Sequence, residues 1–348
     1  MNYNDLFEKV LTESSKFAER IQVGKNENGA KAFKCTPKTK KMKLWEIFGN
    51  GAKMPKEFNN AYIAATSGGG YESRRITQLN SSSLLALLCF WNVSENKPLE
   101  IDGFKYTQVF FEVENEVFNH NSSIDILLIS KDNSEYLFLE SKFTEILNPT
   151  NQYWLGEKYH NIYTAISDNL GKIKVSDVMT REHKVNGKTK PIEEFSITQN
   201  KKRYYAGIKQ MISHIIGLLR GPGEDMNAPH KEAYNKTNIK IKLGTILYDF
   251  SKFDVEDFSK KYEDYVEFYK KSFTSENNAD IISKIVANPI LKDKVKLNAN
   301  TLEIIKEPLT YQDIFVIQNP HFLLQNVSNF YKLCQESHME GPKLEARG

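Results

Sequence analysis

The chain has 348 residues, 40% of them hydrophobic, and is long enough to bury a substantial core as one large domain or two. Lys and Arg number 47 against 44 Asp and Glu, a near balance that neither requires nor excludes a nucleic-acid partner. Three widely spaced cysteines argue against a zinc–thiolate site, an iron–sulfur cluster and a disulfide scaffold. No signal peptide is evident and no apolar run approaches the roughly 20 residues that span a bilayer, so we expect a cytoplasmic protein without membrane contact.

Residues 1–65 are predicted to form a helical and basic extension ahead of the core. The apolar positions of residues 5–21 have helical spacing, and a basic stretch that includes Lys40 and Lys41 follows them. That stretch suits either a solvated loop or a surface that contacts phosphates. Three glycines at 68–70 come next, but neither of the common glycine-rich nucleotide-binding patterns is present, which argues against a nucleotide site.

The predicted core, residues 66–250, begins with a helix and a strand. Three serines at 81–83 suit the N-terminus of a helix over 84–90, whose apolar composition indicates burial against a sheet. Residues 106–118 then alternate with a period of two, as a strand does. One face of this strand carries Glu112, Glu114 and Glu116, which suit either a solvated edge or an acidic cleft.

A hairpin is predicted over residues 123–144, where two apolar runs flank a cluster of turn formers at 131–135. Asp125 lies inside the first run, and Glu140 and Lys142 end the second. Buried charges are costly unless they are paired or bind a metal. Residues two apart on a strand face the same way, so Glu140 and Lys142 project together, and Asp125 can reach the same place. Such a group suits a hard divalent cation, with a lysine left to act on water or phosphate.

The rest of the core is predicted to contain a polar insertion at about 148–205 with a short helix near 156–170 and a basic, loop-like part at 181–190. A helix over 206–220 follows, with Gln210 and His214 on one side, and then a strand over 239–250. Residues 251–340 are predicted to be mostly helical and packed on the core, with helices at 255–273, 280–286 and 322–334 and a candidate strand at 296–305. The polar tail at 341–348 is predicted to be disordered.

In the order of its elements the chain resembles the PD-(D/E)XK nuclease superfamily over residues 68–250. Asp125 takes the place of the first acid of that motif, and Glu140 and Lys142 take its second acid and lysine. Gln210 and His214 stand where RecB-like branches carry Gln-x-x-x-Tyr, with histidine in place of tyrosine. The chain also departs from the pattern at Ile124, where the family has proline.

The resemblance implies an α/β protein with a restriction-endonuclease-like core. This core is a central mixed sheet of four or five strands flanked by helices, with helical additions at both ends of the chain. It also implies an Mg²⁺-dependent DNA endonuclease, with Mn²⁺ as a substitute, that hydrolyses phosphodiester bonds and serves in restriction or defence. Relatives that cut both strands of a duplex commonly act as dimers, so a homodimer stays open.

The resemblance also implies roles for individual residues. The metal ligands would be Asp125, Glu140 and a glutamate from the N-terminal side, for which Glu72 is the first choice and Glu112, Glu114 and Glu116 are rivals. Lys142 and Gln210 would complete the catalytic set, with His214 and Glu145 as further candidates. The phosphate backbone of DNA would contact Lys40, Lys41, Lys201, Lys202 and Arg203.

Two other readings of the same residues stay open. One is a nucleic-acid-binding module that keeps the fold but does not cut, although a module without catalysis has no need of a costly buried charge cluster. The other is an exonuclease, or a nuclease directed at RNA, with the same fold.

Overall fold

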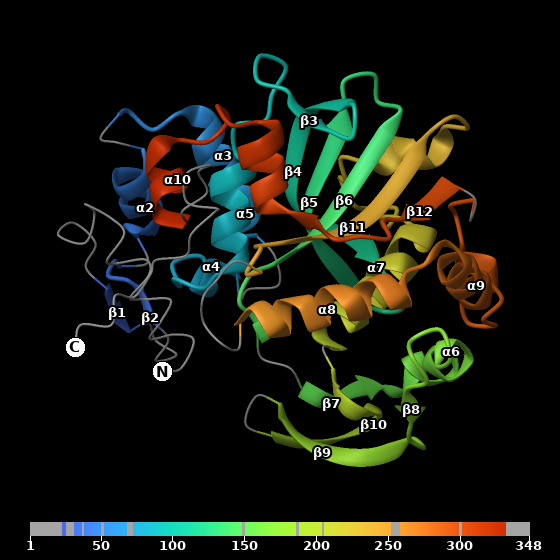
Figure 1. Cartoon of the computed structure of the whole chain (residues 1–348). Helices are drawn as coiled ribbons and strands as arrows, with labels where there is room; N and C mark the ends of the chain where they lie inside the picture. Colours follow the sequence, from blue (N-terminus) through green and yellow to red (C-terminus); the bar gives the residue numbers. More distant parts are fainter. Residues whose placement is uncertain are drawn as a thin grey trace.

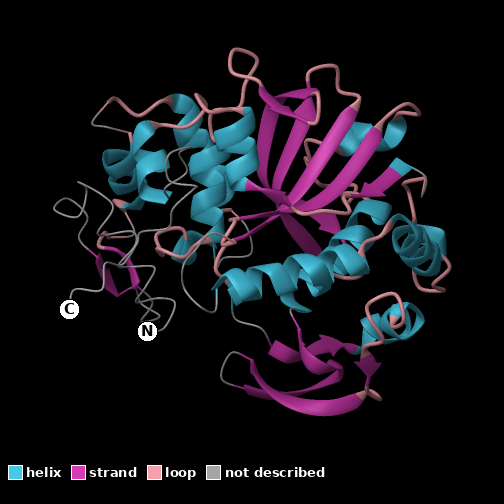
Figure 2. Cartoon of the chain, viewed as in Figure 1, coloured by secondary structure: helices cyan, strands magenta, loops and turns pink. Residues whose placement is uncertain are grey.

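The structure is a computed structural model that describes residues 23–25, 31–36, 38–49, 52–67, 72–147, 150–185, 188–203, 205–251, 258–298 and 301–331. The helix predicted at 5–21 and the tail at 341–348 lie outside these ranges. The described chain is an α/β protein in which a curled mixed sheet is flanked by helices, and a second, smaller sheet lies below it (Figures 1 and 2). No helix in these ranges is both long and apolar enough to cross a membrane.

The central sheet has seven strands, more than the four or five expected, in the order β12-β11-β6-β5-β4-β3 with β13 also paired to β11. Neighbours from β3 to β6 are antiparallel, whereas β6, β12 and β13 run parallel to β11. The additional strands are two or three residues long, too short to show a periodic pattern in the sequence. The strands are β3 (Leu99–Ile101), β4 (Phe104–Glu116), β5 (Asn121–Ser130), β6 (Glu135–Lys142), β11 (Lys240–Leu247), β12 (Leu302–Ile304) and β13 (Leu309–Thr310).

The predicted helices of the core are confirmed, with small changes in their bounds. Ser81 caps the first of them by accepting a hydrogen bond from the backbone N–H of Leu84 at 3.1 Å. All the side chains of that helix are buried except Ser82. The helices are α2 (Lys40–Phe48), α3 (Lys56–Ala65), α4 (Glu72–Arg75), α5 (Ser82–Phe90), α6 (His160–Ile166), α7 (Tyr205–Arg220), α8 (Phe258–Ser272), α9 (Ser275–Val286) and α10 (Gln325–Tyr331).

The predicted hairpin is formed by β5 and β6, and β6 is buried along its whole length. Its alternate side chains meet different helices. Ser141 faces α5, since its hydroxyl donates to the carbonyl of Ser82 at 3.2 Å. Glu140 faces α7 on the other side, where it is hydrogen-bonded to Gln210 and His214. A strand covered on both faces is apolar on both, which explains the continuous apolar run in the sequence.

The insertion is a sheet of its own, made of β7 (Thr150–Gly156), β8 (Lys174–Val175), β9 (Met179–Val185) and β10 (Lys188–Arg203). Its expected short helix is α6. The expected loop at 181–190 is wrong, because its described residues, 181–185 and 188–190, belong to the antiparallel pair β9–β10. Most of the described side chains in this part of the pair are exposed, so burial imposes no hydrophobic alternation that would reveal a strand.

Two further expectations about the ends of the chain differ from the structure. Lys40 and Lys41 lie in α2 and not in a loop. This helix forms because one of its faces is buried, by the side chains of Leu44, Trp45, Ile47 and Phe48. In the C-terminal region the candidate strand at 296–305 contains β12, and β13, which was not expected, also joins the central sheet. Its last described helix packs on the N-terminal one, with the rings of Phe48 and Phe330 edge to face at 5.2 Å.

Candidate active site

Asp125 joins β5 to β6 at the point where their backbone pairing stops. The ladder between these strands ends at Ile126 and Leu139, and the same register places Asp125 opposite Glu140. Beyond the ladder, the backbone N–H of Ser141 donates to Oδ2 of Asp125 at 2.7 Å. A side-chain carboxyl oxygen therefore replaces the backbone acceptor, and an ionisable group is held inside the sheet.

Glu140 is the centre of the site and is 2% exposed. Its Oε1 accepts hydrogen bonds from Lys142 Nζ at 2.6 Å and from Gln210 Nε2 at 2.6 Å. Its Oε2 is 2.9 Å from Nε2 of His214. Gln210 and His214 are four residues apart on α7 and so face the same side of that helix. The structure thus brings together Glu140, Lys142, Gln210 and His214.

The charges of Glu140 and Lys142 sustain each other in this buried place. Burial by itself raises the pKa of Glu140, but the Lys142 ammonium and the His214 imidazole outweigh it and lower the pKa to about 2. Burial lowers the pKa of Lys142, but the carboxylates of Glu140, Asp125 and Glu145 outweigh it, so the pKa is raised. Lys142 is therefore held as a cation beside an ionised glutamate.

Asp125 is in the opposite situation, because it lies in an excess of negative charge. Burial, followed by the carboxylates of Glu140 and Glu112, raises its pKa well above the usual value. The Lys142 ammonium and the Ser141 N–H offset this only in part. A bare cluster of carboxylates resists ionisation, and a bound cation would relieve it.

Glu112 comes from the neighbouring strand. The pairs Phe111–Ile126 and Val113–Ile124 between β4 and β5 place Glu112 directly across from Asp125. Its backbone has a φ of 50°, in the left-handed region that non-glycine residues rarely occupy. Ser123 donates to its Oε2 at 2.8 Å. Carboxylates from three adjacent strands, Glu112, Asp125 and Glu140, thus lie in one row across the sheet.

The two other glutamates of β4 have partners elsewhere. Glu116 accepts a hydrogen bond from Arg220 Nη2 at 2.6 Å and lies four strand residues, about 13 Å, from Glu112. Glu114 accepts one from Asn121 Nδ2 at 2.9 Å. Neither is brought to Asp125, whereas Glu112 is.

The remaining predicted residues are placed as follows. Glu145 ties the end of β6 to α5, because it accepts from the Phe143 N–H at 2.7 Å and from Ser82 Oγ at 2.8 Å. Glu72 is the first residue of α4, and its side chain lies outside the described part of the structure.

The basic residues expected to contact DNA make contacts within the protein or end a strand. Lys40 Nζ donates to the carbonyl of Ser73 at 2.7 Å, and Lys41 Nζ donates to the amide oxygen of Asn59. The side chains of the other three, which end β10, are not among those the structure describes: Lys201, Lys202 and Arg203.

A chain of polar side chains that the sequence did not indicate leads away from Glu140. Nδ1 of His214 lies 2.8 Å from Ser122 Oγ, which in turn accepts from Ser213 Oγ at 3.4 Å. The hydroxyl of Tyr159 is 3.5 Å from Ser213 Oγ and 3.1 Å from His120 Nε2. Serines carry no distinctive spacing in a sequence, so only the packing of α7 on β5 reveals this chain.

The residues fit a hard divalent cation by their chemistry, although no preformed metal cluster of three or more His, Cys, Asp or Glu side chains is found within the described ranges. Carboxylate oxygens are the ligands that Mg²⁺ prefers. Within the described part of the chain, Oδ1 of Asp125 accepts no hydrogen bond. An ionised carboxylate has about four acceptor positions, so the hydrogen bonds to Glu140 do not fill it.

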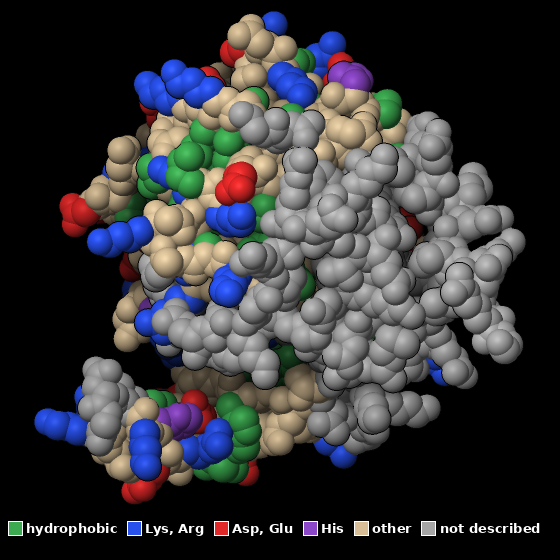
Figure 3. Space-filling view, turned by 90° about the vertical axis from the view of Figure 1, so that its left-hand side faces the viewer, with side chains coloured by type: hydrophobic (Ala, Val, Ile, Leu, Met, Phe, Trp, Pro, Cys, Tyr) green, Lys and Arg blue, Asp and Glu red, His purple; other side chains and the backbone are tan. Residues whose placement is uncertain are grey.

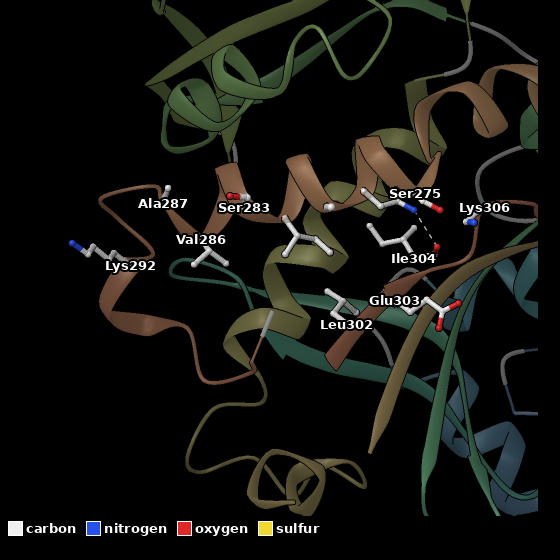
Figure 4. Close-up of a pocket in the computed structure, with 12 residues that line it drawn as sticks. Ser275, Ser283, Val286, Ala287, Lys292, Leu302, Glu303, Ile304 and Lys306 are labelled. Carbon is white, nitrogen blue, oxygen red and sulfur yellow. Dashed lines mark hydrogen bonds between the residues drawn. The ribbon is translucent and has the colours of Figure 1, made fainter. Parts of the chain in front are cut away.

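A cavity of about 940 Å³ lies elsewhere, between α9 and β12 (Figure 4). Its walls combine apolar side chains such as Ile282 with a hydrogen bond of 3.1 Å from Asn278 Nδ2 to the carbonyl of Ile304. Lys292 and Glu303 stand at opposite ends of it, so its charged groups do not converge. It offers no arrangement comparable to that around Glu140.

Comparison with known proteins assigns no family, because no family model, curated protein or solved structure matches the chain.

Proposed function

We propose that the protein is a metal-dependent deoxyribonuclease that hydrolyses phosphodiester bonds in DNA with Mg²⁺, or with Mn²⁺ in its place. The proposal is carried by one observation. A buried Glu140–Lys142 ion pair ends β6 beside Asp125, and a row of three carboxylates faces a single ammonium. Ion pairing alone would need one acid for one lysine, and the additional acids form a charge pattern that a bound divalent cation would balance.

A second buried ion pair in the same sheet provides the comparison. Glu135, at the start of β6, accepts a hydrogen bond from the Tyr106 hydroxyl and pairs with Lys242 Nζ at 2.9 Å. Here one acid meets one lysine and one phenol, as expected of a structural pair. The site at Glu140 differs in its additional carboxylates and in the two hydrogen bonds from α7.

Asp125, Glu112 and Glu140 would hold the cation, whose chemistry is to lower the pKa of a bound water and to stabilise charge on the phosphate. Lys142 would neutralise negative charge on the phosphate group. Because its pKa is raised, it is a poor candidate for the base that deprotonates the attacking water. Gln210 and His214 would fix the orientation of the Glu140 carboxylate, and Ser122 would fix the His214 ring.

The test is cleavage of supercoiled plasmid by the purified protein in Mg²⁺ or Mn²⁺. We expect nicking or cutting, and at least a hundredfold loss in Lys142→Ala. Lys242→Ala is the matched control, because it also removes a lysine from a buried ion pair of the same sheet but lies away from the carboxylate row. Full activity in Lys142→Ala, or equal loss in both folded variants, would refute the proposal.

A protein of this fold that binds nucleic acid without cutting is distinguished by its response to metal. A cation that binds the native state raises the melting temperature, so wild type should shift with Mn²⁺ and Asp125→Asn should not. Linear DNA, circular DNA and RNA tested side by side separate an endonuclease from an exonuclease and from a ribonuclease.

A further inference from the structure

The small sheet formed by β7, β8, β9 and β10 has two faces of different charge. Side chains on neighbouring strands that are paired in register point to the same face, and alternate residues along β10 point to opposite faces. The registers of β10 with β7, β8 and β9 therefore sort every described strand side chain of this sheet. Figure 3 shows the sheet as a separate lobe at the bottom of the view, with Lys and Arg side chains on its surface.

One face, which we name the basic face, contains the β10 residues of even number and their partners. Its charged strand residues are Lys174, Arg181, His183, Lys188, Lys190 and a single described carboxylate, Glu194. The side chain of Glu194 is 14% exposed, and its Oε2 lies 3.2 Å from Nη1 of Arg181 and 2.9 Å from Nε2 of His183. Among the described side chains of this face, no further carboxylate balances the positive charge of the three lysines.

These lysines are available to a partner. Lys174, Lys188 and Lys190 are exposed, and within the described ranges no carboxylate lies within ion-pair distance of them. At the centre of the face the Arg181 guanidinium lies 4.0 Å from the centroid of the Trp154 ring, a cation–π contact that helps to position it. Ile192, 37% exposed, adds an apolar contact between the charged positions.

The opposite face has the opposite character. Its inner part, with Phe195 and Ile197, is buried, and the ring of Phe195 lies edge to face against His160 of α6 at 5.1 Å. Its outer part carries Glu182 and Glu193. This outer part also carries Lys184, so its two acids outnumber its one base, whereas bases outnumber the single acid on the basic face. A polyanion would therefore be attracted to the basic face and not to the opposite one.

Both connections of the small sheet start at the candidate active site. β7 begins at Thr150, eight residues after Lys142, and β10 ends at Arg203, seven residues before Gln210. The lobe is thus inserted between the two segments that supply Glu140 and its α7 partners. The lobe is therefore next to the site along the chain, which is the position expected of a part that contacts the phosphates flanking a cut.

We infer that the basic face of the small sheet binds the phosphate backbone of the DNA that is cut at the carboxylate row. The inference rests on the proposed function for the identity of the polyanion. Lys188 and Lys190 are the principal contacts, two residues apart on one strand and so about 7 Å apart, the separation of adjacent phosphates along a DNA strand. Contacts of this kind position DNA without selecting its sequence.

The test measures binding of a fluorescent 30-base-pair duplex by anisotropy in EDTA, where no cutting occurs. Lys188→Glu/Lys190→Glu should weaken binding at least tenfold and reduce the slope of log affinity against log salt by roughly 2. Lys184→Glu is the control for each single variant, Lys188→Glu or Lys190→Glu, because it reverses the charge of one lysine on the opposite face of the same pair of strands. It should leave affinity within about twofold.

Equal effects of Lys184→Glu and of the single variants, or none from the double variant, would overturn the inference. The inference would also be overturned if the wild-type protein bound no duplex DNA, or if the double variant lost binding of RNA but not of DNA. If the double variant loses DNA binding but the wild-type protein cuts no DNA with Mg²⁺, the DNA-binding role of the basic face is supported and the proposed function is refuted. If Lys142→Ala abolishes cutting while the double variant binds DNA normally, the proposed function is supported and the DNA-binding role of the basic face is refuted.

Discussion

The backbone N–H of Ser141 donates to the carboxylate of Asp125, and this one hydrogen bond of 2.7 Å joins β5 to β6 where their ladder has ended. The bond holds Asp125 beside Glu140, in a place where burial and two other carboxylates oppose its ionisation. A carboxylate in such a position weakens the fold at neutral pH, and this cost is typical of residues kept for function.

Asp125→Asn is therefore predicted to stabilise the protein and to abolish cutting. Asparagine keeps an oxygen that can accept from Ser141 but carries no charge. A carboxyl whose folded pKa is raised loses stability as pH rises above its unfolded pKa of roughly 4. In EDTA, urea unfolding should show a higher free energy for Asp125→Asn at pH 8, with the gain shrinking toward pH 4. If Asp125→Asn were less stable than wild type at pH 8, it would contradict the view that burial and the neighbouring carboxylates oppose ionisation of Asp125.

Glu112→Gln and Glu116→Gln are predicted to separate metal binding from stability on a single strand. Glu112 lies across from Asp125, so its loss should raise the Mn²⁺ concentration needed for half-maximal cutting about tenfold or more. Glu116 pairs with Arg220, so its loss should lower the free energy of unfolding by about 1 kcal/mol and leave the metal requirement unchanged. Metal titrations of cutting and urea unfolding measure the two effects. The reverse assignment would remove Glu112 from the site.

His230 is predicted to make the fold sensitive to mild acid. The ring is fully buried, with Nε2 2.8 Å from Asn115 Oδ1, and burial lowers its pKa to about 4. Stability from a histidine whose folded pKa is lowered is complete above the unfolded pKa near 6.5 and is lost as pH falls toward 4. The loss should reach about 3 kcal/mol. His230→Phe should flatten this part of the stability–pH curve, and the exposed His321→Phe should not.

Gly207→Ala is predicted to destabilise the protein, although alanine normally stabilises a helix interior by about 1 kcal/mol relative to glycine. A β-carbon at Gly207, in the first turns of α7, would overlap the hydroxyl of the buried Tyr265. We expect a loss of about 1–3 kcal/mol in urea unfolding, with partial recovery in Gly207→Ala/Tyr265→Phe. Gly156→Ala is the control, because no atom lies within 4 Å of its added carbon. A neutral Gly207→Ala would mean that α7 can move away from α8.

Local patterns are sufficient to predict the hairpin strands β5 and β6, the helices α5 and α7, and the common face of Glu140 and Lys142, but not the 16-residue strand β10. Burial on both faces makes β5 and β6 continuous apolar runs, so the charges of Asp125, Glu140 and Lys142 stand out against them. The spacing of Gln210 and His214 along a regular helix likewise follows from local periodicity. The N-terminal cap at Ser81 is also a local signal.

The choice between the glutamates of β4 depends on strand pairing, which no local pattern shows. Glu112, Glu114 and Glu116 share a strand face and are equivalent in pattern, but strand register puts Glu112 opposite Asp125 and Arg220 draws Glu116 away. The short strand β13 and the strands of the insertion carry too little buried alternation to be predicted from the sequence, whereas β12 lies within the candidate strand at 296–305. The basic face exists only because the register of β9 with β10 gathers its lysines on one side. Side chains distant in the sequence meet through pairing and packing, which local patterns do not encode.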